Sequence, residues 1–287
     1  MPAFNEWNWQ AHFLTEDGQS VLMPLVIDFD CAVKTDSPPV LDGDLAEWKA
    51  AAPLHMNLES YTDGSFGTQW SPADLSATVY TLWDADYLYL AIPVHDQTFQ
   101  QILEGESVWN QDSIQLGFAT DAQGMLAEFS LALTPKGSQV FKFGTGLLTD
   151  AKLAVKLLQG QTVYEGAIPW TELNGIQPAA GADCRFDILL NDHDAITSRR
   201  YMFRYGRGIV HEKNPNLFGY LRWVDNQQNQ IPENAPKETN VIFREDFEEY
   251  PDQSVPYLWQ RVVHMMPDGS SLVSLGAGSD RSQGLVL

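Results

Sequence analysis

Apolar and polar residues alternate along most of the chain between residues 77 and 224. Successive side chains of a β-strand point to opposite faces, so a period of two predicts strands with one buried face. The run from Tyr87 to Val94 is apolar on both faces and is expected in the middle of a sheet. The expected strands are residues 77–83, 87–94, 112–118, 128–133, 139–143, 153–158, 162–168, 186–190, 200–203 and 220–224.

Turn residues separate these strands and leave little room for helix. Asp84-Ala85-Asp86 joins the first two strands in a predicted hairpin, and similar Asp- or Gly-containing turns follow. Two short helical turns are expected, one capped by Asp44 before Leu45 and Trp48, the other opened by Pro169. Many short strands at regular spacing predict an all-β fold, an antiparallel β-sandwich.

The segment from Val108 to Phe118 places an aromatic ring beside a polar strand face. Trp109 precedes Asp112, and the strand that follows turns its apolar residues to one face and Gln115 to the other. A flat ring next to a hydrogen-bonding amide suits a sugar better than a nucleotide or a lipid. A Trp that only covers the edge of the sandwich, and an Asp that only begins a strand, fit the same pattern.

The pattern divides the chain into four parts. Residues 1–36 are expected to form an N-terminal β segment, either as one strand or as two strands split at Pro24. This segment is the end of an upstream domain or an added edge strand. Residues 37–225 hold the sandwich, and the polar, Pro-containing stretch 226–240 is a linker. Residues 241–287 begin a new β pattern but are too few for a sandwich of roughly a hundred residues. They are expected to be an incomplete second β domain or a piece packed on the first, which indicates part of a longer protein.

Charge and length limit the classes of partner. The 287 residues carry 17 Lys and Arg against 38 Asp and Glu, a net charge of −21 that repels nucleic acid and anionic membranes. No apolar run approaches the length of a membrane span, and the N-terminus lacks the pattern of a secretory signal. Cys31 and Cys184 have no neighbours at metal-binding spacing, and two separate thiols are favoured over a disulfide.

Six motifs occur in the order typical of one family. They are Leu41-Asp42-Gly43-Asp44 with Trp48, Leu82 to Tyr89, Trp109 to Ser113, Tyr164 to Trp170, Leu190-Asn191-Asp192, and Asn214 to Leu221. Together they resemble the family 9 carbohydrate-binding modules from about Val40 to Val224. The resemblance implies a non-catalytic β-sandwich that binds polysaccharide or oligosaccharide as part of a larger, extracellular or periplasmic glycan-processing protein such as a xylanase.

The same resemblance implies roles for individual residues. Members of the best understood type hold the end of a sugar chain between two Trp rings, and Trp109 matches the first ring. Gln115 stands where that type has a carboxylate, and Asp112 would order or bond hydroxyl groups beside it. The position of the second ring holds Glu212, so His211 or Tyr205 is expected to take its place. A basic residue of the family is replaced by Ser130.

The resemblance also implies structural calcium. Calcium binds six or more oxygen atoms, and the stretch Asn191 to Asp194 could supply some of them.

Other classes of function stay open from the sequence. A spacer sandwich that has lost its sugar site agrees with the missing second Trp. A glycoside hydrolase needs two carboxylates at a set separation, and most acidic residues here lie in predicted turns. A haem-b electron-transfer domain of related topology would need axial ligands, for which Met202 and His211 are the candidates.

Overall fold

The computed structural model describes the chain in eight stretches. These are residues 9–14, 20–25, 29–62, 70–193, 200–210, 213–225, 274–277 and 283–286. The chain divides into two compact units, one of Met1–Trp7 with Asp28–Asn229 and the other of Asn8–Ile27 with Gln230–Leu287. None of the described helices is long and apolar enough to cross a membrane.

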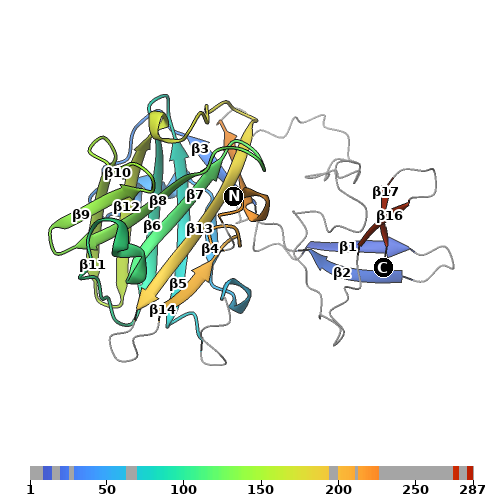
Figure 1. The fold of residues 1–287 in the computed structure, drawn as a ribbon, viewed down its shortest axis with the longest axis horizontal. Coiled ribbons are helices and arrows are strands. Elements are labelled where there is room, and N and C mark those ends of the chain that lie inside the picture. Colours follow the sequence, from blue (N-terminus) through green and yellow to red (C-terminus); the bar gives the residue numbers. More distant parts are fainter. Residues whose placement is uncertain are drawn as a thin grey trace. The chain divides into compact units, whose positions relative to one another are not determined.

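The first unit is built on one 13-stranded sheet that curls on itself (Figure 1). The order of hydrogen-bonded strands is β10-β9-β8-β7-β13-β15-β3-β5-β6-β12-β11, with β14 beside β13 and β4 beside β5. The strands are β3 (Phe29–Lys34), β4 (Pro53–Met56), β5 (Leu75–Trp83), β6 (Tyr87–Asp96), β7 (Ser113–Ala119), β8 (Ala127–Thr134), β9 (Gly137–Lys142), β10 (Gly146–Leu147), β11 (Lys152–Leu158), β12 (Gln161–Pro169), β13 (Asp183–His193), β14 (Arg200–Arg204) and β15 (Gly219–Val224).

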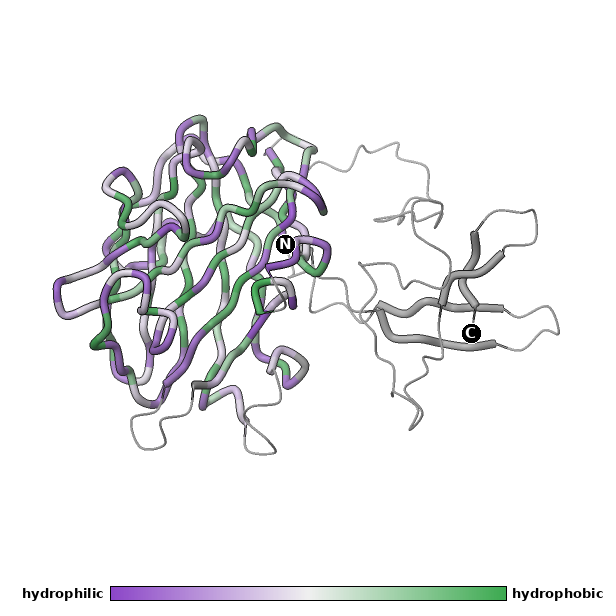
Figure 2. Tube along the Cα trace, in the orientation of Figure 1, coloured by the Kyte–Doolittle hydropathy of each residue, from purple (hydrophilic) through white to green (hydrophobic). Residues whose placement is uncertain are grey.

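Two layers of the curled sheet face each other across an apolar core. Alternate residues of β5, β6 and β12 meet those of β7, β8 and β13, as expected for the inner faces of a sandwich. The ring of Phe118 packs against Phe129 at 6.1 Å and against Phe186 at 5.2 Å between centroids. In Figure 2 the apolar positions follow the strands and many connecting loops are hydrophilic.

The predicted strands are confirmed with shifts of a few residues at their ends, and the all-β sandwich is confirmed with them. The sheet is mixed rather than purely antiparallel, because β3 pairs in parallel with both β15 and β5. Strand β3 lies between β15, the last strand of one antiparallel set, and β5, the first strand of the other. It runs in the same direction as both neighbours. The sheet therefore begins at Phe29, before the boundary expected at residue 37.

The short helices in the described part of the chain are 3₁₀ turns that hold the loops in place. They are η2 (Leu45–Ala50), η3 (Glu59–Tyr61), η4 (Gly105–Asn110), η5 (Trp170–Glu172) and η6 (Pro215–Leu217). The expected cap is confirmed, since the Asp44 side chain accepts a 3.0 Å bond from the N–H of Ala46. The buried Trp48 donates its indole N–H to Glu165 on β12 at 2.7 Å, which ties η2 to the sheet.

The described part of the second unit consists of two hairpins. Strands β1 (Trp9–Leu14) and β2 (Ser20–Leu25) pair antiparallel, and so do β16 (Ser274–Ala277) and β17 (Gln283–Val286). Pro24 lies inside β2, opposite Gln10, so the chain does not break into two strands there. The expected linker 226–240 and the start of the expected β pattern at 241 lie outside the described residues.

Both cysteines are buried free thiols, as the sequence favoured. Burial raises the pKa of Cys31 to about 12, helped by the nearby charge of Asp30, and burial also raises the pKa of Cys184. Both groups are therefore unreactive thiols that act as small apolar side chains.

Candidate functional site

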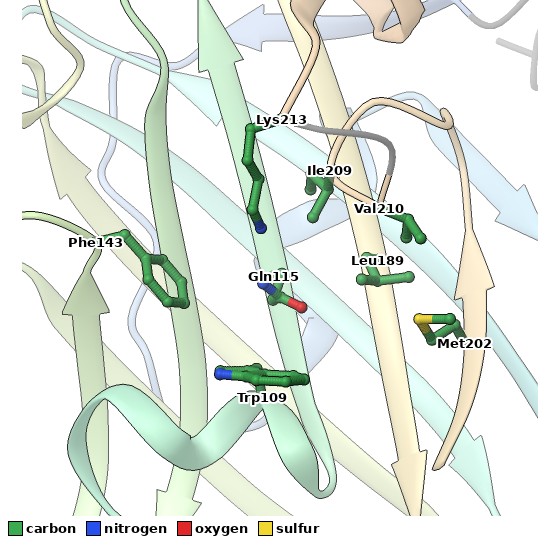
Figure 3. A pocket seen from close by; sticks show the side chains of 8 residues that line it. All are labelled: Trp109, Gln115, Phe143, Leu189, Met202, Ile209, Val210 and Lys213. Atoms are coloured by element: carbon green, nitrogen blue, oxygen red, sulfur yellow. The ribbon is translucent and has the colours of Figure 1, made fainter.

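An open hollow of about 370 Å³ lies on the outer face of the layer formed by β7 and β13 (Figure 3). Trp109 and Lys213 lie on opposite sides of Gln115, Phe143 lies on one flank, and aliphatic side chains lie on the other. The hollow is lined by Trp109, Gln115, Phe143, Leu189, Met202, Ile209, Val210 and Lys213. Its size is at the lower end of the range for small-ligand sites.

Trp109 stands on η4, which the surrounding chain holds in place. The buried Val108 accepts a 2.8 Å bond from the Gln101 amide at its backbone carbonyl. The Gln139 side chain on β9 accepts from the Gly105 N–H and donates to the Gly105 carbonyl, both at 3.2 Å. These bonds join η4 to two neighbouring segments, so the indole is presented from an ordered support.

Gln115 lies at the floor of the hollow with its amide oriented by its neighbours. Its oxygen accepts from the Asn191 amide at 3.2 Å, and its nitrogen donates to a Glu128 carboxylate oxygen at 3.0 Å. Lys213 forms an ion pair with the same oxygen of Glu128. The floor is therefore a connected polar network that runs from β13 through β7 and β8 to the loop before η6.

The Glu128–Lys213 pair sets the charge at the hollow. Burial raises the pKa of Glu128, while bonding and attraction from Lys213 and a bond from Gln115 act against this rise. The Lys213 ammonium also lies 5.5 Å from the centre of the Phe143 ring, within range of a cation–π contact. Lys213 has a φ of 56°, so its backbone adopts the left-handed conformation that is uncommon for residues with a side chain.

The aliphatic wall of the hollow is supported from behind. Leu189 and Ile209 are buried in a small cluster with Phe218 on the outer face of the sheet. A side chain at position 117 would meet the Phe218 ring at 2.7 Å, so Gly117 on β7 leaves the space that this ring fills. Met202 and Val210 pack on the cluster and remain partly exposed at the hollow.

The loop that supplies Ile209 and Val210 to this wall is ordered by one buried carboxylate. Asp187 on β13 accepts backbone N–H bonds from Gly206 at 2.7 Å, Gly208 at 3.0 Å and Ile209 at 3.1 Å. An added side-chain carbon at Gly208 would lie 2.2 Å from Phe218, so only glycine fits there. The wall is thus a fixed part of the fold.

The structure brings together only some of the residues predicted for the site. Trp109 and Gln115 line the same hollow, whereas Asp112 lies in a separate acidic cluster. Tyr205 is buried in the core, where its ring packs 5.9 Å from that of Phe186, and it does not line the hollow. His211 lies outside the described residues, and so does Glu212.

Most residues of the site were not predicted from the sequence, among them the three that give it a second aromatic ring and a charged pair. Phe143, Glu128 and Lys213 come from different segments, and none lies near Trp109 in the sequence. Glu128 could have been suspected, because it is a charged residue on an otherwise apolar and small-residue strand. Phe143 precedes a Gly-Thr-Gly turn and looks like an ordinary strand-end aromatic. Met202, considered as a haem ligand, is part of the aliphatic wall.

A cluster of three carboxylates lies at the edge of the core near the ends of β6 and β13. One oxygen each of Asp96, Asp112 and Asp192 lies within 4.8 Å of the others. Asp112 accepts N–H bonds from Gln100 and from His193, the latter at 2.7 Å. Burial and the charges of Asp96 and Asp192 raise the pKa of Asp112 to about 9 despite these bonds.

The geometry of the three carboxylates fits a calcium ion. Oxygens bound to one Ca²⁺ at about 2.4 Å lie no more than about 4.8 Å apart. A cavity of about 10 Å³ adjoins the cluster, and its described lining contains no Lys or Arg. Asp112 and Asp192 belong to the motifs considered for calcium and sugar binding, and Asp96 joins them from the end of β6.

Comparison with known proteins places the chain in a family. A family model described as carbohydrate family 9 binding domain-like matches residues 41–226. The chain belongs to this family. Endo-1,4-beta-xylanase A of Thermotoga maritima and the enzyme of the same name from Thermotoga neapolitana are each 26% identical over 198 residues. This match covers 65% of the chain but only 17% of either xylanase.

Solved structures of family 9 modules share the fold. A module from Caldicellulosiruptor kristjanssonii in complex with cellotriose superposes with a TM-score of 0.54 at 17% identity, over 72% of this chain and all of that module. The structure of such a module from the same organism with glucose gives a TM-score of 0.53 at 18% identity, over 71% of this chain and all of that module. The sandwich is therefore the fold of family 9 modules.

The hollow differs in detail from the two-Trp pattern that the family resemblance implies. Trp109 is present, but Phe143 is the second aromatic side chain among the residues that line the hollow. Ser130 is fully buried and lies opposite Gln115 in the pairing of β7 with β8. Glu128 and Lys213 supply a carboxylate and an ammonium from other positions, so this family 9 chain keeps a charged pair beside the amide.

Proposed function

We propose that this chain binds carbohydrate without catalysis, at the hollow beside Trp109. The observation that carries the proposal is an indole held at the edge of a hollow whose floor is the bonded network of Gln115, Glu128 and Lys213. A pyranose presents one apolar face and a rim of hydroxyl groups. The ring face would pack on Trp109, and the hydroxyls would exchange bonds with the amide and the charged pair.

The arrangement of carboxylates favours binding over hydrolysis. Hydrolysis of a glycosidic bond generally uses two carboxyl groups on either side of that bond. Glu128 is largely buried and already bonded to Gln115 and Lys213, and the described residues that line the hollow include no Asp or Glu. The chain would accordingly deliver or hold a glycan for a reaction carried out elsewhere.

We further propose that Asp96, Asp112 and Asp192 hold a structural calcium ion. Three carboxylates pressed together in a buried place repel one another, and a divalent cation removes that repulsion. The ion would join the end of β6, the start of β7 and the end of β13. Its role would be to fix these strands and the η4 loop that precedes Asp112.

The relatives support a proposal about the wider context of the chain. The chain corresponds to a small part of two xylanases, so we propose that it acts within a larger polysaccharide-processing protein outside the cytoplasm. Its ligand would be a polysaccharide or an oligosaccharide derived from one. The spacer alternative would need the hollow to have no ligand, although its indole and polar floor are assembled as a sugar site requires.

Calorimetric titration of the full chain with xylo-, cello- and manno-oligosaccharides tests the proposal. Trp109→Ala is expected to weaken binding at least tenfold, since it removes the stacking surface. Leu158→Ala, a change at an exposed residue of β11, is the control and should bind as the unchanged chain does. Equal affinity of the Trp109→Ala variant would move the site elsewhere, and no binding by any folded sample with calcium present would favour the spacer.

A further inference from the structure

We propose that the sugar ring bound in the hollow carries a methyl group that packs on its aliphatic wall. The group would be the methyl of a 6-deoxy sugar, an O-methyl or an O-acetyl substituent. This inference rests on the proposed carbohydrate binding at Trp109 and specifies the class of sugar. It comes from the unequal chemistry of the two sides of the hollow.

One side of the hollow offers polar contacts, whereas the described side chains of the other side are apolar. Gln115 and Lys213 lie at the floor and on the side opposite Trp109 (Figure 3). Among the described residues, the remaining flank consists of Leu189, Met202, Ile209 and Val210, of which only the Met thioether accepts a hydrogen bond, and weakly.

An unsubstituted hexose or pentose can bind such a hollow through Trp109 and the polar floor, but it leaves the aliphatic flank without a matching group. Its ring carries hydroxyl groups around the whole rim, so turning some toward Gln115 and Lys213 turns others toward the aliphatic flank. A hydroxyl buried there loses water without gaining a partner, which is unfavourable. A methyl group at the same position gains from leaving water instead.

The flank is built to keep its shape. The loop from Gly206 to Ile209 is held by three backbone bonds to Asp187, and Phe218 fills the space behind it. The wall therefore does not need to collapse on the ligand. Met202 and Val210 stay partly exposed, which leaves apolar surface available to a substituent, and the flexible Met side chain can adapt to its size.

The volume agrees with one substituted ring. The open hollow has a volume of about 370 Å³, which gives room for a single sugar ring with a small group. The inference thus predicts recognition of a decorated or deoxy residue in a glycan. It does not require contacts along an extended chain.

Matched sugar pairs test the inference on the full chain. Calorimetry would compare L-fucose with L-galactose, acetylated xylotetraose with the same sample after deacetylation, and a 4-O-methyl with an unmethylated glucuronoside. The three pairs distinguish the sources of the methyl group. In at least one pair the methyl-bearing sugar should bind about tenfold more tightly, the scale set by one methyl group in an apolar pocket.

A nearly isosteric variant separates this inference from the proposed function. Val210→Thr places a hydroxyl at the wall and should reduce the preference within the favoured pair severalfold, while Val40→Thr at an exposed site should not. If the unsubstituted sugars bind equally or better and still require Trp109, the inference is overturned and the proposed function stands. If no sugar binds and Trp109→Ala changes nothing, both are overturned.

Discussion

At the scale of single residues, the ion pair of Glu128 with Lys213 determines the charge beside the hollow. Glu128 is tolerated as a buried carboxylate because Lys213 neutralises it and Gln115 donates to it. The pair in turn fixes the Gln115 amide and brings an ammonium group over Phe143. The family resemblance implies a carboxylate at position 115 and a basic residue at position 130. In this chain, Glu128 and Lys213 supply the two charges instead.

Asp30 on β3 is a buried carboxyl group that should make stability depend on pH. Burial raises its pKa to about 7, although the Cys31 N–H and the Thr81 hydroxyl act against this. Between about pH 4 and 7, the Asp30 carboxyl group therefore keeps its proton in the folded chain and loses it in the unfolded chain. Stability contributed by this group is full below pH 4 and is lost as the pH rises to 7.

Asp30→Asn should remove that dependence. The variant is expected to gain roughly 2–4 kcal/mol in free energy of unfolding at pH 8 and almost nothing at pH 4. Denaturant unfolding at the two pH values measures this, with the exposed Asp36→Asn as the control. An equal effect at both pH values would show that the carboxyl group is not protonated in the folded chain.

At the scale of elements, short turns and loops position the site more than the strands do. The η4 turn presents Trp109, and the loop after β14 presents Ile209 and Val210 of the aliphatic wall. Each is tied to the sheet by side chains that bond backbone groups, Gln139 for η4 and Asp187 for the loop. Capture of backbone N–H groups by a carboxylate is a strong way to order irregular chain.

Asp187→Asn should loosen the wall without changing the pattern of apolar residues. The amide turns an N–H group toward backbone donors, so we expect a loss of about 1–3 kcal/mol in stability and severalfold weaker sugar binding. Thermal unfolding and calorimetry measure the two effects, with the exposed Asp183→Asn on the same strand as the control. Unchanged binding in a destabilised variant would mean that this loop does not contact the sugar.

At the scale of the whole molecule, the proposed calcium ion would connect three segments of the sandwich that are separate in the sequence. Asp96, Asp112 and Asp192 are far apart in the sequence but lie on neighbouring parts of the fold. An ion that binds only the folded chain raises its stability by mass action. The acidic cluster should therefore make stability depend on calcium.

Removal of calcium with a chelator should lower the melting temperature of the full chain. At a calcium concentration a hundred times the dissociation constant, the expected stabilisation is about 2.7 kcal/mol. Asp192→Asn should reduce the calcium response, and the exposed Asp121→Asn should retain it. If scanning calorimetry gives the same melting temperature with and without calcium or magnesium, the proposed calcium site is excluded.

Ten of the strands, the two short helical turns named above and the sandwich class were predictable from the sequence, because alternation, caps and turn residues are local patterns. Alternation along the chain states which face of a strand is buried, and Asp44 caps η2 through a contact two residues away. The parallel pairing of β3 was not predictable in this way. Which strands it joins depends on where the two antiparallel sets end.

The sequence by itself determined that this chain is a family 9 sandwich. It also placed Trp109 just before a strand and Gln115 on the polar face of that strand. Only the tertiary structure decided that Phe143, Glu128 and Lys213 meet them, that Tyr205 belongs to the core, and that Asp112 joins an acidic cluster instead. The physical reason is distance along the chain. Local patterns select the conformation and the buried face of each segment, whereas a binding site is made by side chains that folding brings together from separate segments.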